Sequence, residues 1–313
     1  MTVMTNNGSI DGVDVAGLLG IPISAEQERA VRAPLDPCVV IAGAGTGKTT
    51  VMAARVVWLV ASGLVSPEEI LGLTFTNKAT MELSERIESN LTRVGLLKPD
   101  QPRPTVATYD SFAGTLVGDY GAWDGINTGA HLMTGARAYQ LASEVVVGLD
   151  KAPLAATHLG PTPIAQAVVK LAAAMASHDA SPDEVRKADA RWRQMLLDAP
   201  TKKGGGRYAD IDTWLSRVDE REEFLELVAA YQELKKERGL VEFGDRMVQA
   251  LHLVTHHPRV GEELRARYRV VLLDEYQDTS SAQADVLAAL FSGPDSSHGM
   301  GHPVMAVGDP LQA

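Results

Sequence analysis

Residues 39–50 read Val-Val-Ile-Ala-Gly-Ala-Gly-Thr-Gly-Lys-Thr-Thr, and this stretch decides the fold. A short apolar run leads into a loop with three glycines, and Lys48-Thr49 follow where a helix should begin. Glycines let backbone N–H groups turn inward around a polyanion without Cβ clashes. A helix N-terminus adds unsatisfied donors and a partial positive charge. The stretch therefore predicts a nucleotide-phosphate site.

The residue types in this loop indicate how it would hold a nucleotide. Lys48 would reach the β- and γ-phosphates, and the Thr49 hydroxyl would coordinate Mg²⁺. The first position of the G-x-x-x-x-G-K-[ST] pattern is Ala42 rather than Gly, which is a known variant. A glycine-rich turn without a ligand is the weaker alternative, because Lys-Thr follows the last glycine. The predicted phosphate-binding residues are Ala42, Gly43, Ala44, Gly45, Thr46, Gly47, Lys48, Thr49 and Thr50.

Polar residues also follow two later apolar runs. Asp274 and Glu275 come after a run of Val and Leu, and Gln312 comes after Val304–Val307. In open parallel sheets, ligands bind beyond the carboxyl ends of the strands. Asp274 can hold Mg²⁺ together with Thr49, and Glu275 can orient and deprotonate the attacking water. Gln312 can hydrogen-bond the γ-phosphate or that water, so the set indicates hydrolysis of ATP.

Gln27 is the candidate for recognition of the base. It lies in Ser24-Ala25-Glu26-Gln27, which fits a helix capping box. Its amide can also read the donor–acceptor edge of adenine bidentately. Both interpretations, a cap alone and an adenine contact, stay open at the level of the sequence.

The pattern along the chain predicts an α/β fold. Apolar runs at 37–42, 70–75, 106–109, 269–273 and 304–307 alternate with segments of helical period. This alternation is typical of a parallel sheet covered by helices. Between about 113 and 240 the helical period dominates and no strand stands out. We therefore expect a flexible leader at 1–20, a discontinuous sheet subdomain at 21–112 and 241–313, and an all-helical insertion at 113–240.

Composition sets broad limits on the partners and the compartment. The hydrophobic fraction of 45% fits a globular protein, and no apolar run reaches the ~20 residues of a membrane helix. A single cysteine, Cys38, and the absence of a secretory signal in the polar N-terminus favour the cytoplasm. The net charge of −11 argues against a nucleic-acid coat but allows a local binding groove. The basic, glycine-rich loop Thr201–Tyr208 is either solvated or a nucleic-acid contact.

The order of these motifs resembles the superfamily 1 DNA helicases of the UvrD/Rep/PcrA type. The matching segments are Gln27, Ala42–Thr49, Thr74–Ala79, Thr108–Phe112, Leu273–Thr279 and Val307–Gln312. The A-x-x-G-x-G-K-T loop is also typical of this group, and residues 239–243 look like the return from the insertion to the sheet. Residues 52–58 are closer to the actinobacterial AdnA/AdnB-type helicase–nuclease subunits.

This resemblance implies an ATP-dependent helicase or translocase that moves along single-stranded DNA, 3′ to 5′, in DNA repair or recombination. The fold would be a RecA-like P-loop NTPase, with the sheet as subdomain 1A and the insertion as subdomain 1B. Asp110 stands where the family usually has His, and a carboxylate would face the DNA backbone unfavourably. The resemblance implies DNA contacts at Phe75, Thr76, Asn77, Thr108, Tyr109 and Ser111. Phe75 would stack on a base, and a core aromatic is its alternative.

The sequence ends at Ala313, before the remaining helicase motifs. We therefore expect the N-terminal half of a longer helicase, whose second motor domain (2A/2B) supplies the arginines that complete the ATP site. The fragment alone is expected to bind nucleotide weakly and not to unwind DNA. A duplex junction and a nuclease domain or subunit are further implied partners. A non-catalytic nucleotide- or DNA-binding scaffold is the alternative, whereas the Asp-Glu-Tyr-Gln-Asp run disfavours a small-molecule kinase.

Overall fold

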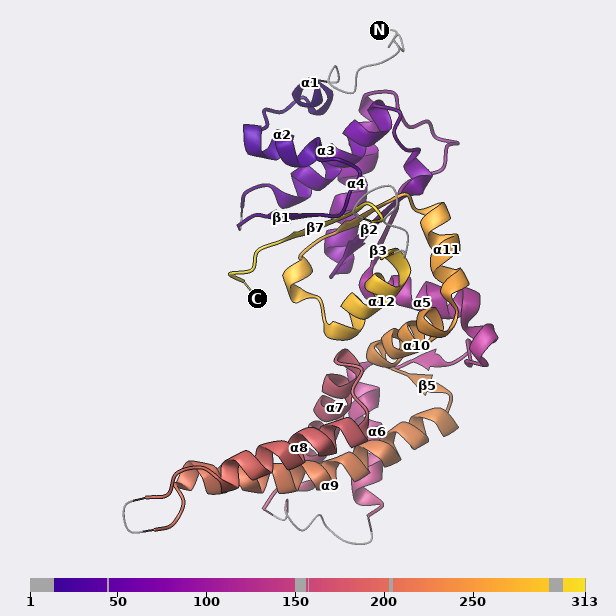
Figure 1. Ribbon diagram of the computed structural model, residues 1–313. Helices are drawn as coiled ribbons and strands as arrows, with labels where there is room; N and C mark the ends of the chain where they lie inside the picture. Colours follow the sequence, from indigo (N-terminus) through magenta and orange to yellow (C-terminus); the bar gives the residue numbers. More distant parts are fainter. Residues whose placement is uncertain are drawn as a thin grey trace. The chain divides into compact units, whose positions relative to one another are not determined.

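The computed structural model describes residues 14–43, 45–149, 156, 158–202, 205–292 and 301–312. The chain divides into two compact units (Figure 1). One, the sheet unit, comprises the chain up to Thr115 together with Val254–Thr279 and the part from Ala284 onward. The other, the helical unit, comprises Leu116–Leu253 and Ser280–Gln283. No helix in the described part of the chain is long and apolar enough to cross a membrane.

The sheet unit is built on five strands in the order β1-β7-β6-β2-β3, and all neighbouring pairs are parallel. The strands are β1 (Cys38–Ile41), β2 (Ile70–Thr74), β3 (Thr105–Thr108), β6 (Val270–Leu273) and β7 (Val304–Gly308). Every residue of β2 and β6 is buried, as expected for near-continuous apolar strands covered on both faces. The predicted α/β fold with a parallel sheet is confirmed.

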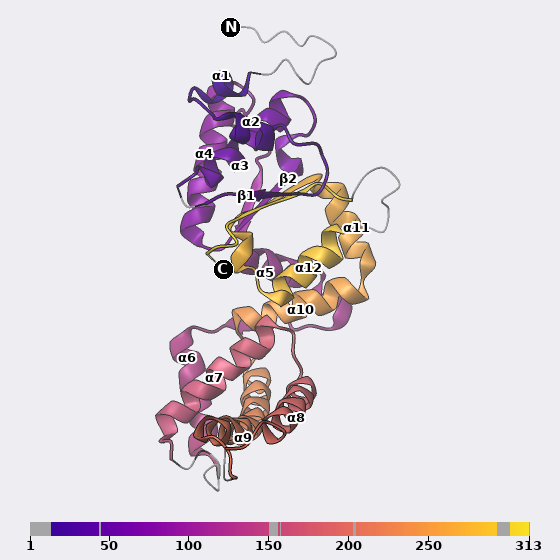
Figure 2. The same cartoon turned by 60° about the vertical axis from the view of Figure 1, so that its left-hand side comes forward.

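Helices cover both faces of this sheet (Figure 2). Figures 1 and 2 show α2, α3 and α4 on one face and α11 and α12 on the other. The helices of this unit are α1 (Val15–Leu19), α2 (Ala25–Val31), α3 (Lys48–Ala61), α4 (Asn77–Arg93), α5 (Tyr109–Tyr120), α11 (Pro258–Arg267) and α12 (Ser281–Phe291), with single turns at Pro67–Glu69 and Tyr276–Asp278. Residues 51–59 of α3 are all buried, so this helix is the centre of the hydrophobic core.

The predicted leader at 1–20 is too long. Residues 1–13 lie outside the described residues, but α1 begins at Val15. The Asp14 side chain caps this helix by accepting from the Gly17 N–H at 3.0 Å. Val15 and Leu19 are buried in the same core as α3. Burial of two apolar side chains therefore orders a segment that we expected to be loose.

The helical unit contains α6 (Gly135–Val147), α7 (Pro161–Ser177), α8 (Pro182–Leu197), α9 (Ala209–Glu237) and most of α10 (Phe243–His256). Its core joins α6 and α7 to the second half of α9. The expectation that it has no strand, and that residues 239–243 return to the sheet, is wrong. Leu240–Val241 form β5, which pairs with β4 (His131–Leu132) inside the helical unit. Two-residue strands are too short to produce a period that a sequence can reveal.

The chain passes between the units at other places than we predicted. The expected insertion spans 113–240, whereas the helical unit spans Leu116–Leu253 and includes Ser280–Gln283. The boundary near 115 falls within α5, and the boundary near 253 falls within α10. Continuous helical periodicity across both points hides the boundaries from the sequence.

A buried lysine fixes the end of α9 in the helical unit. Lys235 is 2% exposed, and its ammonium lies 2.8 Å from Glu242 Oε2 and 2.6 Å from Asp245 Oδ2. The ammonium also lies 4.9 Å from the centre of the Tyr231 ring. Asp245 in turn accepts from the Glu242 N–H at 2.8 Å. The cluster therefore ties α9 to the start of α10.

We expect Lys235→Met to destabilise the helical unit by about 3 kcal/mol, because it leaves two partly buried carboxylates without their cation. The measurement is the midpoint of urea unfolding followed by circular dichroism. Lys236→Met is the matched control, since Lys236 is adjacent and exposed. Equal midpoints for the two variants would contradict the structural role of Lys235.

Candidate nucleotide site

The phosphate loop connects β1 to α3. Gly45 and Gly47 have φ values of 72° and 85°, in the left-handed region that favours glycine. The Thr46 hydroxyl donates to the Gly43 carbonyl at 2.8 Å and closes the loop. Among the described residues no side chain caps the N-terminus of α3 at Gly47, which leaves its first N–H groups available to an anion. Ala44, one of the predicted phosphate-binding residues, lies outside the described residues.

Lys48 and Glu275 meet at the edge of the sheet although they are 227 residues apart. The Lys48 ammonium donates to Glu275 Oε2 at 2.7 Å. Burial raises the pKa of the Glu275 carboxyl, but the hydrogen bonds from Lys48 and Gln277 outweigh it and leave the pKa below its ordinary value. Glu275 is therefore held as a carboxylate, the form that can accept a proton.

Asp274 is a buried carboxylate of the site, with 5% exposure. Its Oδ1 accepts from the Glu275 N–H at 3.1 Å, and its carbonyl accepts from the Tyr109 hydroxyl at 3.4 Å. Burial raises the pKa of Asp274, and the negative charge of Glu275 adds to this. A bound cation would favour the charged form and remove this cost.

The oxygen donors at this edge suit a magnesium ion that is bound together with a nucleotide. Within the described ranges, no group of three or more His, Cys, Asp or Glu side chains could hold a metal alone. Magnesium commonly takes only one or two protein carboxylates and completes its shell with phosphate oxygens and water. The Asp274 carboxylate and the Thr49 hydroxyl in the first turn of α3 fit this donor set.

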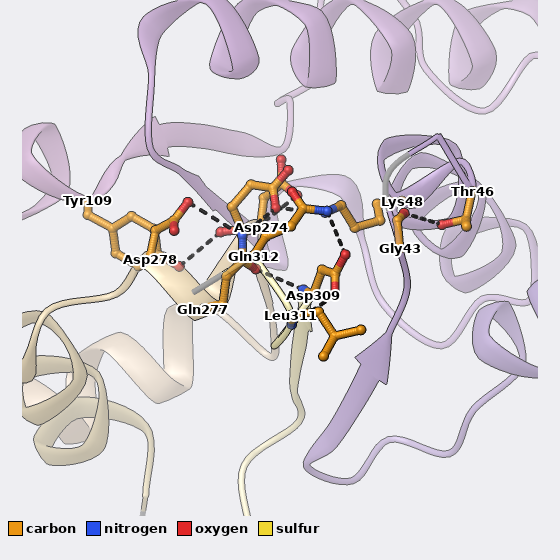
Figure 3. A network of polar contacts seen from close by, with 11 residues as sticks. Gly43, Thr46, Lys48, Tyr109, Asp274, Gln277, Asp278, Asp309, Leu311 and Gln312 are labelled. Atoms are coloured by element: carbon orange, nitrogen blue, oxygen red, sulfur yellow. Dashed lines mark hydrogen bonds and ion pairs between the residues drawn. The ribbon is translucent and has the colours of Figure 1, made fainter.

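The sequence did not reveal the role of Gln277. Its amide Nε2 donates to Glu275 Oε2 at 2.8 Å, and its Oε1 accepts from the Asp309 N–H at 2.9 Å (Figure 3). One side chain therefore joins the segment after β6 to the end of β7. The Gln277 amide also requires Gly308, because a Cβ there would lie 2.6 Å from Gln277 Oε1. The only sequence signal was a Gln two residues after the predicted catalytic glutamate.

Gln312 lies at the same edge, at the end of β7. Its Nε2 donates to Asp309 Oδ2 at 2.5 Å, and Asp309 is buried. Asp309 Oδ1 also accepts from the Leu311 N–H at 3.0 Å, so Asp309 organises the turn that carries Gln312. Figure 3 shows Asp309 and Gln312 beside Asp274 and Lys48. Asp309, which we did not predict, therefore belongs to the site.

Gln27 makes the predicted cap and one further contact. Its Oε1 accepts from the Ser24 N–H at 2.8 Å, and its own N–H donates to Ser24 Oγ at 3.2 Å. These two bonds confirm the capping box. In addition, Gln27 Nε2 donates to the Thr46 carbonyl at 3.0 Å, which ties α2 to the phosphate loop. One amide hydrogen and one lone pair are left over, so the cap does not preclude an adenine contact.

Comparison with known proteins shows the family of the chain. A family model described as UvrD/REP helicase N-terminal domain matches residues 23–313. The chain belongs to this family. This confirms the resemblance seen in the sequence, whereas the likeness to the AdnA/AdnB-type subunits stays a prediction.

This chain is similar in sequence to three DNA helicases that are each much longer. It is 26% identical to DNA helicase II of Rickettsia typhi over 275 residues, which are 86% of this chain and 36% of the relative. It is 27% identical to ATP-dependent DNA helicase UvrD1 of Mycobacterium tuberculosis over 301 residues, 96% of this chain and 34% of the relative. It is 28% identical to DNA helicase II of Haemophilus influenzae over 272 residues, 87% of this chain and 32% of the relative. The chain spans about a third of the length of these relatives.

Three of the DNA contacts that the UvrD/REP resemblance implies lie at the start of α4. The Phe75 side chain is half-buried, and its ring centre lies 4.8 Å from that of Tyr109. Thr76 is exposed, but its hydroxyl accepts from the Ala79 N–H and caps α4. Asn77 is exposed. Phe75, Thr76 and Asn77 all stay predicted DNA contacts, because each offers accessible surface.

The other three lie where β3 passes into α5. Thr108 and Tyr109 are 9% and 4% exposed, so their side chains pack in the core, and a DNA contact at either residue stays a prediction. The strand that we predicted at 106–109 ends at Thr108, and Tyr109 begins the helix. Burial also raises the pKa of the Tyr109 hydroxyl, which stays protonated and donates to Asp274. Ser111 is exposed and remains a predicted contact.

Thr50, Cys38 and the basic loop Thr201–Tyr208 are the other residues that the sequence singled out. Thr50 accepts from Arg86 of α4 at 2.8 Å, next to the phosphate loop. Cys38 is half-buried in β1, and burial raises the pKa of its thiol, which fits a packing role. In the basic loop, the Lys202 ammonium lies 5.7 Å from the centre of the Tyr208 ring. Its residues Lys203 and Gly204 lie outside the described residues.

We expect Gly308→Ala to lower the stability of the sheet unit by about 1–3 kcal/mol, because its Cβ would displace the Gln277 amide and press on the Gln277 backbone N, 3.2 Å away. Thermal unfolding followed by circular dichroism measures the change. Gly72→Ala in β2 is the matched control, since its Cβ would meet only side-chain carbons at 3.6 Å or more. A Gly308→Ala protein as stable as the control would show that Gln277 is not held in the observed position.

Proposed function

We propose that this chain is the ATP-binding part of an ATP-dependent DNA helicase or translocase, in which ATP hydrolysis drives movement along single-stranded DNA. The observation that carries the proposal is the contact of Lys48 with Glu275. It brings the phosphate-binding lysine and the predicted catalytic carboxylate to one point at the edge of the sheet. The UvrD/REP family match and the printed names of the relatives, DNA helicase II and UvrD1, support it.

In this proposal, the phosphate loop binds ATP through the N–H groups at the start of α3, and Lys48 neutralises the β- and γ-phosphates. When bound with ATP, Mg²⁺ supplies further neutralisation of phosphate charge, and Thr49 and Asp274 are the residues that would hold it. Gln27 orients the adenine, because α2 is tied directly to the loop. These residues bind and place the substrate before any bond is broken.

Glu275 then acts on water. Its carboxylate accepts a proton from the attacking water, whose oxygen bonds to the γ-phosphorus while the bond to the β-phosphate oxygen breaks and ADP leaves with the electron pair. Lys48 donates to Glu275 in the structure, so the lysine must turn from the carboxylate to the phosphates when ATP binds. Gln277 keeps its hydrogen bond to Glu275 and preserves the orientation of the carboxylate during this exchange.

The proposal includes partners outside the chain. Single-stranded DNA would run past Phe75, Asn77 and Ser111, and a second motor domain would complete the ATP site, as the length of the relatives suggests. A duplex junction is the substrate that such a motor would act on. We also propose a cytoplasmic location, because the single cysteine fits a reducing compartment.

Two substitutions test the ATP site in the polypeptide that carries both motor domains. Lys48→Ala removes phosphate neutralisation, and we expect ATP turnover to fall at least 100-fold, with weaker nucleotide binding. Glu275→Gln removes the base but keeps the size of the side chain, so ATP should bind as before while turnover falls by a similar factor. Steady-state turnover and equilibrium binding of a fluorescent ATP analogue measure both effects. Equal loss of binding in the two variants would show that Glu275 is not the base.

A third substitution tests the DNA surface in the same polypeptide. We expect Phe75→Ala to weaken binding of single-stranded oligonucleotides by about 1–3 kcal/mol, the range for one stacked base. Fluorescence anisotropy with a labelled oligonucleotide measures the affinity. Met81→Ala is the matched control, because Met81 is an exposed apolar residue in the second turn of α4, six residues after Phe75. A loss no larger than that of the control would leave Phe75 as a packing residue for Tyr109.

A further inference from the structure

Arg55 is a buried arginine in α3, two turns beyond Lys48, and the ATP mechanism does not use it. Its side chain is 1% exposed. Within the described part of the chain, the guanidinium donates only to backbone carbonyls: Nη1 lies 3.0 Å from the Val31 oxygen and 2.8 Å from the Ala33 oxygen. Nη1 also lies 3.3 Å from the Ala30 oxygen, and Nη2 lies 3.0 Å from the Pro34 oxygen. A single side chain thus holds four carbonyls at the end of α2.

These carbonyls explain how the charge can be buried. Ala30 and Val31 belong to the last turn of α2, where the carbonyls carry the negative partial charge of the helix, and Ala33 and Pro34 follow the helix. No carboxylate pairs with Arg55 among the described residues, and burial lowers the pKa of its guanidinium. Arginine stays protonated because its ordinary pKa is very high. Its planar fork reaches several acceptors at once, which a lysine ammonium on a flexible stem does less well.

The other end of α2 is held by the nucleotide site. Gln27 lies in its first turn, accepts from the Ser24 N–H and donates to the Thr46 carbonyl of the phosphate loop. The helix has only seven residues, so it has too few internal hydrogen bonds to stay in place by itself. The N-terminal end of α2 is thus attached to the phosphate loop, and its C-terminal end is attached to α3, which follows that loop directly.

We propose that Arg55 is a positioning residue that sets the place of Gln27 and thereby the preference of the site for adenine. The proposal rests on the proposed function, in which the site binds ATP and Gln27 contacts the base. Arg55 holds the C-terminal end of α2 against α3, so that the Gln27 amide stays at a fixed distance from the phosphate loop. Loss of this hold lets α2 shift, which moves Gln27 while the loop and Lys48 stay in place.

The test compares nucleotides that differ only in the base. We measure displacement of a fluorescent ADP analogue from the 313-residue chain by ATP, by GTP and by inorganic tripolyphosphate. Arg55→Lys keeps the charge but loses the fork, and we expect the ratio of ATP to GTP affinity to fall about three- to tenfold, the effect of one lost hydrogen bond. Affinity for tripolyphosphate should stay within twofold of the original chain. General damage to the phosphate loop would instead lower all three affinities together and would overturn the proposal.

Two further variants make the result specific. Arg269→Lys is the matched control, because Arg269 donates to the Leu64 carbonyl at 3.1 Å on the surface of the same unit. Its ATP to GTP ratio should not change. Pro34→Gly replaces an exposed residue whose carbonyl is one of the four acceptors, so it loosens the backbone there and leaves the Arg55 side chain itself unchanged. It should also lower the ratio of ATP to GTP affinity. If Arg55→Lys does not fold, this variant alone tests the proposal.

Gln27→Ala separates this proposal from the proposed function. If Gln27→Ala lowers the ratio but neither Arg55→Lys nor Pro34→Gly does, Arg55 does not position Gln27. If Gln27→Ala leaves the ratio unchanged, Gln27 does not contact the base and the positioning role falls with it. If the original chain binds neither nucleotide nor tripolyphosphate, the phosphate site itself is refuted.

Discussion

Strands that run parallel all end at the same edge of their sheet, and the nucleotide site depends on this constraint. The strand order is β1-β7-β6. The phosphate loop follows β1, Gln312 follows β7, and Asp274 and Glu275 follow β6. Lys48 and Glu275 are therefore within hydrogen-bond distance although 227 positions separate them in the sequence. Reversal of β6 alone would move Asp274 and Glu275 to the opposite edge, and a different strand order would separate them from the phosphate loop along the same edge.

The stability of the site rests on α3. Its residues 51–59 are all buried, so the helix cannot rotate or slide without opening the core of the sheet unit. The phosphate loop is the N-terminal continuation of this helix, and its N–H groups keep a fixed direction. Packing of apolar side chains therefore fixes the position of the loop, whereas hydrogen bonds fix the positions of Gln277 and Asp309. Rigid donors gain most from a charged ligand, because they need no reorganisation when it binds.

The sequence was sufficient where function depends on local pattern and insufficient where it depends on tertiary contacts. The phosphate loop, the Ser24–Gln27 capping box and the parallel strands follow from residue types and spacing. The burial of Tyr109 could not be predicted, because it arises from pairing of β2 with β3 and from contact with Phe75. The bridge made by Gln277 needs the ends of β6 and β7 side by side, which no local pattern reveals.

The backbone of Glu275 shows how these contacts act together. Its φ of 47° and ψ of 43° lie in the left-handed region, which costs a residue with a side chain roughly 1–2 kcal/mol. Hydrogen bonds from Lys48 and Gln277 to its carboxylate, and from its own N–H to Asp274, can offset that cost. In the proposed mechanism Lys48 turns to a phosphate, and Gln277 and Asp274 are then left to hold this conformation. The orientation of the Glu275 carboxylate, the proposed base, therefore depends on a glutamine whose side-chain oxygen accepts from the Asp309 N–H at the end of β7, so a shift of β7 would reach Glu275 directly.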